Sequence, residues 1–237
     1  MITQALMPGP AVSTALLLLL SCLIGPGALA AENPDEGDVR NLRIGMHVAD
    51  IHSDDYRAVS CASTSDAESA PLAAIQQFRE CRADSRGLHP LRMHYAPIQP
   101  WSQISSRFSG TKIAGHPVNL WIDVDTNGRV QSIRAETDEA ASRYLRKKAF
   151  LLGLRVKARY GRENWTCERA GPDQNKLRVG GMFIDEVCEK SLEGRRLILQ
   201  TNLYRAQGQE ADEFVGSTRL QFLAKDVAPV AIDEHRN

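Results

Sequence analysis

The alternation of apolar and polar residues is clearest in the middle of the chain, where it predicts a β-hairpin. Apolar residues occupy every second position of residues 118–124 and polar residues the others, apart from Trp121, and residues 130–135 form the returning strand. Such a pattern is typical of strands with one buried face. The residues between them include Asn127-Gly128, a pair that tolerates positive φ at both central positions of a tight turn. We therefore expect the two strands to pair through this turn.

The same periodicity predicts strands elsewhere in the chain. Residues 91–95 alternate as in a half-buried strand, and a short strand ends at residues 59–61. A helix is expected to begin at residues 69–71, because the apolar residues from there to Cys81 share one helical face. The last third is expected to form a meander of three strands at residues 179–188, 196–204 and 217–223.

One long helix is predicted over residues 138–160. Thr137 offers a capping hydroxyl, two acidic residues follow it, and Gly161 supplies a stop. An alternative is a strand over residues 154–160, where apolar and basic residues alternate strictly. We favour the helix. The expected fold is therefore α+β, with antiparallel strands in one or two small sheets packed against the helix.

The N-terminus has the pattern of a signal peptide. An apolar run at residues 11–24 is shorter than the roughly 20 residues of a membrane span, and Ala28-Leu29-Ala30 offers small residues for cleavage before Ala31. A lipoprotein anchored through Cys22 is the alternative. We then expect a flexible lead-in at 31–41, a globular domain at 42–224 without a transmembrane segment, and a tail at 225–237. A weak repeat of cysteine and glycine spacing suggests two lobes, 42–136 and 161–224, joined by the helix.

Four cysteines remain after the signal peptide is removed, and an even number in an oxidising compartment predicts disulfides. Three pairings are possible. We favour Cys61–Cys81 and Cys167–Cys188, because each closes a loop of about 20 residues at low entropic cost. A metal site or a redox pair is the alternative, although no Cys-x-x-Cys occurs and the spacings match no zinc motif.

Charge limits the partners. Basic and acidic residues balance at 29 each, so the chain has no electrostatic footprint for nucleic acid. Residues 140–162 nevertheless contain basic residues and no acidic ones. A contact with an anionic envelope surface is predicted for the first part of this run, at Arg143, Arg146, Lys147 and Lys148. The alternative is a solvated helix face neutralised by acidic residues elsewhere in the fold.

Candidate chemistry is sparse. His47, His52 and His94 are weak candidates for a soft or borderline metal, because two of them follow a methionine. Residues 123–128 match the first half of a calcium loop, but its twelfth position is Arg134, which would repel the ion. Residues 109–112 match the S-x-x-K motif of penicillin-recognising enzymes, but the companion motifs S-D-N and K-T-G are absent, so we name no catalytic residue and expect no cofactor. The alternative is a hydrolase or metal-handling protein whose site is dispersed along the chain.

Short motifs near the C-terminus carry a family resemblance. They are Lys157-Ala158-Arg159-Tyr160-Gly161, Trp165-Thr166-Cys167, Cys188-Glu189-Lys190 and Gly194-Arg195-Arg196-Leu197. Over residues 42–223 the chain resembles uncharacterised exported proteins of alphaproteobacteria. The resemblance implies a periplasmic location but no activity or site residues. We expect a periplasmic or secreted, non-enzymatic accessory protein that binds an envelope protein or an anionic envelope surface.

Overall fold

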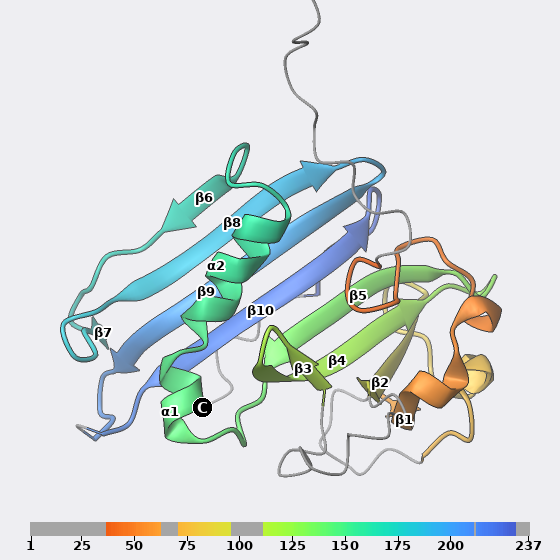
Figure 1. The fold of residues 1–237 in the computed structure, drawn as a ribbon, viewed down its shortest axis with the longest axis horizontal. Helices are drawn as coiled ribbons and strands as arrows, with labels where there is room; N and C mark the ends of the chain where they lie inside the picture. The colour runs from red at the N-terminus through yellow and green to blue at the C-terminus, as the bar shows by residue number, and fades with distance from the viewer. Residues whose placement is uncertain (1–36, 63–70, 96–110, 211, 231–237) are drawn as a thin grey trace, which may run out of the picture. The chain divides into compact units, whose positions relative to one another are not determined.

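The computed structural model describes residues 37–62, 71–95, 111–210 and 212–230. The predicted signal peptide, with Cys22, lies outside these residues. The described residues form a ten-stranded antiparallel sheet, whose main path runs β1-β2-β4-β5-β10-β9-β8-β6 (Figure 1). Two short strands lie off this path, since β3 pairs with β4 and β7 pairs with β9.

The elements follow one another in chain order. The strands are β1 (Tyr56–Cys61), β2 (His89–Tyr95), β3 (Thr111–Ile113), β4 (His116–Val124), β5 (Val130–Thr137), β6 (Thr166–Arg169), β7 (Lys176–Leu177), β8 (Ile184–Leu192), β9 (Arg195–Ala206) and β10 (Val215–Ala224). The helices are η1 (Val48–Asp50), η2 (Ser53–Asp55), η3 (Ile75–Glu80), α1 (Arg143–Lys147) and α2 (Phe150–Arg159), of which the three η elements are 3₁₀ turns.

The predicted hairpin is confirmed as β4 and β5. Ile122 pairs with Ile133, and the turn is held by Asp125, whose carboxylate accepts hydrogen bonds from the backbone N–H groups of Asn127 and Arg129. Gly128 has a φ of 80°, which favours glycine. The polar residues of this loop therefore act as turn residues, as the Asn-Gly signal predicted.

The core lies on one face of the sheet, because alternate residues of each strand point to that face. Leu120, Ile133, Leu199 and Phe222 are fully buried there. Helix α2 packs across β9 and β10, and Figure 1 shows α1 and α2 following each other over the same face of the sheet. The opposite face carries the side chains between these buried positions.

The predicted α+β fold with one long helix is wrong, and the protein is mostly β. The segment predicted as helix 138–160 contains a turn, then α1, then α2. The turn forms because the Asp138 carboxylate accepts a hydrogen bond from Ala140 N–H. Ser142 then caps α1 by accepting from Leu145 N–H. Local side-chain hydrogen bonds of this kind compete with a continuous helix.

The junction between α1 and α2 contacts β10. The carbonyl of Ala149 accepts a hydrogen bond from the Thr218 hydroxyl as well as one from Leu152 N–H at the start of α2. Around this point the backbone forms i→i−3 bonds, as at Ala149 N–H to Arg146. Residues 154–159 are helical, so the alternative strand at this place is also wrong.

Several strand predictions hold with changed limits. The strands predicted at 91–95, 196–204 and 217–223 correspond to β2, β9 and β10. The strand predicted at 179–188 begins only at Ile184, after a turn in which Val179 bridges to Met182. The helix expected before Cys81 is the 3₁₀ turn η3. Strands from both proposed lobes belong to one sheet, joined where β5 pairs with β10.

Candidate functional site

Both predicted disulfides are confirmed. Cys61 is bonded to Cys81, and Cys167 is bonded to Cys188. They lie at opposite ends of the sheet path, since Cys61 belongs to β1 and Cys167 to β6. Two such bonds are typical of a protein that folds in an oxidising environment. Among the described residues, no helix has both the length and the apolar character needed to cross a membrane.

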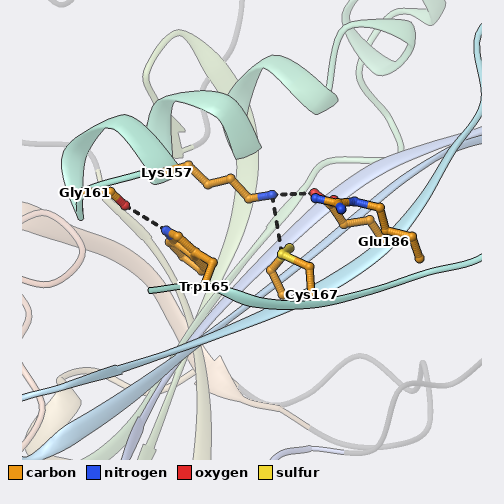
Figure 2. The surroundings of a disulfide bond; sticks show 7 residues. Lys157, Gly161, Trp165, Cys167 and Glu186 are labelled. Carbon is orange, nitrogen blue, oxygen red and sulfur yellow. Dashed lines mark hydrogen bonds and ion pairs between the residues drawn. A yellow bond between two sulfur atoms is a disulfide. The ribbon is translucent and has the colours of Figure 1, made fainter. Parts of the chain in front are cut away.

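The second disulfide has a charged neighbour. Figure 2 shows Lys157 reaching from α2 toward Cys167 and Glu186, with its ammonium 4.0 Å from the Cys167 sulfur. Burial alone would raise the pKa of Glu186, but hydrogen bonds from Lys157 and Arg169 outweigh it and lower the pKa below its ordinary value. Both cysteine sulfurs are used in the disulfide, so they offer no thiolate to a metal. This cluster therefore joins α2 to the sheet.

The candidate histidines do not come together. His47 bridges to Arg129 beside the β4–β5 turn, whereas His94 lies near the far end of β2, where its neighbour Met93 pairs with Leu120. In the part of the chain that the structure describes, no group of three potential metal ligands includes a histidine. Burial and the neighbouring Arg92 lower the pKa of His94. His52 precedes η2 and is exposed.

The predicted basic residues lie on α1 and just after it, outside the core. Arg143 forms an ion pair with Asp212 at 2.7 Å, and Arg146 lies over the ring of Phe214. Lys147 is exposed, and the Lys148 ammonium lies 4.1 Å from the ring centre of Tyr144. Of these four residues, Arg143 is thus neutralised by an acidic residue from elsewhere in the fold, as the alternative interpretation of the basic run predicts. Lys147 and Lys148 have no ion pair within the described residues.

Further along, α2 presents basic and apolar side chains outward. Arg155 is exposed, and so is Arg162, two residues beyond the helix cap. Neither forms an ion pair among the described residues. Leu154 is 57% exposed and Tyr144 on α1 is 66% exposed, so both side chains are open to contact. We call Tyr144, Lys147, Lys148, Leu154, Arg155 and Arg162 the helix-layer surface.

A groove of about 690 Å³ lies on the opposite face of the sheet, over β10, β9, β8 and β6. Val187 and Ile198 form an apolar floor, and the chain after β10 adds Pro229 and Val230. These floor residues point away from α2, because Ile198 alternates with the buried residues of β9. We call this pocket the open-face groove.

Polar side chains line the rest of the open-face groove. They are the neutral Asn164, Thr166, Ser191, Gln200 and Gln221 and the charged Glu168, Glu189 and Arg219. Arg219 donates from Nε and Nη2 to the two carboxylate oxygens of Glu136, while its Nη1 is buried without an acceptor. The groove thus has an arginine at its β10 end and two glutamates at its β6–β8 end.

Beyond the groove, the same face of the sheet carries a second arginine on β5. Gln221 pairs with Arg134 on β5, which in turn pairs with Trp121 on β4. The Arg134 guanidinium lies 4.4 Å from the ring centre of Trp121, a cation–π contact, and its Nε is buried without a partner. Burial lowers the pKa of Arg134.

The groove residues were not predicted from the sequence. They occupy the polar positions of strands that are separated by up to 55 residues, from Thr166 to Gln221. Alternation marks such positions as facing away from the core. Only the strand order β10-β9-β8-β6 brings them side by side.

No protein-family model, no curated protein and no solved structure matches the chain.

Proposed function

We propose that the chain is an exported, non-enzymatic binding protein of the bacterial envelope that docks on an anionic phospholipid surface. The observation that supports this proposal is the helix-layer surface. Lys147, Lys148, Arg155 and Arg162 have no acidic partner among the described residues. The same segment exposes Tyr144 and Leu154, and the Lys148 ammonium lies 4.1 Å from the ring centre of Tyr144.

Electrostatics and apolar contact act together on such a surface. Each lysine or arginine near an anionic leaflet contributes about 1 kcal/mol, and exposed apolar side chains insert at the level of the headgroups. Met182 extends the apolar part, since it is 40% exposed and Gly180, two residues before it, lies beside the Lys147 ammonium. The resemblance to exported proteins and the two disulfides are consistent with an envelope location.

The test is co-sedimentation of the protein with vesicles. We expect binding to vesicles that contain phosphatidylglycerol and little binding to pure phosphatidylcholine vesicles, with a strong loss at high salt because salt screens the attraction. The double variant Lys147→Glu with Arg155→Glu should bind at least about thirtyfold more weakly, since two attractive charges are removed at about 1 kcal/mol each.

A matched variant separates a local effect from a change in net charge. Arg57→Glu with Arg82→Glu makes the same charge change on exposed residues of β1 and of the loop after Cys81. This control should bind anionic vesicles almost as well as the unaltered chain. Equal weakening by both double variants, or equal binding to neutral and anionic vesicles, would contradict the proposal.

A further inference from the structure

We propose that the open-face groove binds an extended peptide segment of a partner protein, with an acidic residue of the peptide beside Arg219 and a basic residue toward Glu168 and Glu189. This inference is independent of membrane docking, because the groove and the helix-layer surface lie on opposite faces of the sheet.

The neutral side chains of the groove suit a peptide backbone. Gln200 and Gln221 each offer both a donor and an acceptor, and Thr166 and Ser191 offer hydroxyl groups. A peptide in extended form presents alternating N–H and C=O groups that need such partners when they leave water. The apolar floor of Val187 and Ile198 provides a surface for alternate side chains of the same peptide.

The charges of the groove give the peptide a direction. Arg219 lines the β10 end of the groove, and two hydrogen bonds to Glu136 hold its guanidinium in place. A carboxylate at this end would meet a positioned guanidinium. At the other end, Glu168 has no ion pair among the described residues, whereas Glu189 already pairs with Arg196 at 3.3 Å. A basic residue of the peptide is therefore expected near Glu168.

The dimensions of the groove fit a short segment. From β6 to β10 the groove crosses three strand spacings, or about 14 Å. An extended chain of about four residues covers that length. The volume of about 690 Å³ falls within the range typical of ligand sites.

The lining argues against other ligand classes. The groove residues include no aromatic ring on which a sugar could stack. Its walls carry too many polar and charged groups for an acyl chain. Glu168 and Glu189 would repel a polyanion. A peptide with separated opposite charges is the chemistry that remains.

The experiment is selection of a phage-displayed library of random linear heptapeptides on the purified full chain, followed by titration calorimetry with the enriched peptides. We expect enriched sequences to carry an acidic and a basic residue three or four positions apart. Gln200→Trp should fill the groove and weaken binding at least tenfold. The matched control Gln207→Trp places the same side chain on an exposed loop and should leave binding unchanged.

The orientation of the peptide in the groove is tested by replacing the acidic residue of a selected peptide with the corresponding amide. This exchange should weaken binding about tenfold to the unaltered chain and have little effect on the double variant Arg219→Gln with Glu136→Gln, which removes both charges of the ion pair. The proposal is overturned if no peptide is enriched, if enriched peptides bind the Gln200→Trp variant equally well, or if a glycan array yields the groove's ligand instead.

Discussion

At the scale of single residues, the distance between α2 and the sheet depends on the absence of one side chain. Gly153 is buried where α2 crosses β9, and a Cβ atom built there would lie 2.8 Å from Thr201 Oγ1. Leu199, on the same strand, would lie 3.8 Å away. Glycine ordinarily weakens a helix interior, so its presence here reflects close packing of helix and sheet.

We expect Gly153→Ala to lower the free energy of unfolding by about 1–3 kcal/mol, as overpacking does in a filled core. The same change in an exposed helix would raise stability by about 1 kcal/mol. Urea denaturation measures the effect. Adding Thr201→Ala to Gly153→Ala should restore part of the loss, because it removes the hydroxyl that the new methyl group meets.

Gly171→Ala is the matched control. A Cβ atom at Gly171 has no neighbour within 4 Å, and its φ lies outside the left-handed region. This variant should keep the stability of the unaltered chain. A Gly153→Ala variant that is as stable as this control would show that α2 shifts freely on the sheet.

At the scale of elements, charged contacts join α2 to β8 and β6 on the core side. Lys157 of α2 and Arg169 of β6 both bind Glu186 of β8. The pKa of Glu186 is lowered in the folded state, so its ionised form contributes stability above the ordinary carboxyl range near pH 4. That contribution is lost as the pH falls through the folded-state pKa.

We therefore expect Glu186→Gln to be less stable than the unaltered chain at pH 7, and the difference to shrink when both are measured at pH 3. Urea denaturation at each pH provides the comparison. Glu80→Gln, at an exposed position of η3, is the control and should show almost no difference at either pH. A constant deficit of Glu186→Gln across this range would mean that its charge does not stabilise the fold.

Strands were more predictable than helices in this chain. The β4–β5 hairpin follows from local signals, since alternation and the Asn-Gly turn act within 20 residues. The long helix was predicted wrongly because Asp138 and Ser142 form local side-chain hydrogen bonds and the backbone forms i→i−3 bonds at Lys148 and Ala149, which the apolar pattern does not reveal. The short strands β3, β6 and β7 carry too little periodicity to be recognised.

At the scale of the whole molecule, one sheet runs through both halves of the sequence. The join is the pairing of β5 with β10, where Thr218 N–H also donates to the hydroxyl of Thr137. The core residues of the two halves form one cluster, which includes Ile122 of β4 and Leu199 of β9. Loss of either half would expose the apolar face of the other.

We expect the two halves to unfold together. Native-state hydrogen exchange should give the backbone amides of β4 and β9 the same free energy of opening, equal to that of global unfolding. The measurement uses the intact oxidised protein. A lower opening free energy confined to one half would show that the halves unfold separately, with the β5–β10 pair as their boundary.

The helix-layer surface and the open-face groove were predictable from the sequence to different degrees. The basic residues between Glu139 and Glu163 lie in one segment without acidic residues, so their exposure on the surface could be predicted. The sequence could not show which of these charges are neutralised, because Asp212, which pairs with Arg143, lies in a distant loop. The open-face groove was missed entirely, since strand order is not encoded in the alternation of any one strand.

The positions of the two disulfides have a consequence for how copies of this protein meet one another. The outer strands of an open sheet expose backbone groups that can recruit a strand from another molecule. Here β1 contains Cys61 and β6 contains Cys167. A disulfide therefore cross-links each terminal strand of the path to a second segment of the same chain, at Cys81 and at Cys188. Residues 71–72 also bond to β1, and β6 is short and ends in exposed Glu168 and Arg169. Oxidation therefore holds the short strands β1 and β6 in place beside β2 and β8, and we expect reduction to weaken that cover at both ends of the sheet.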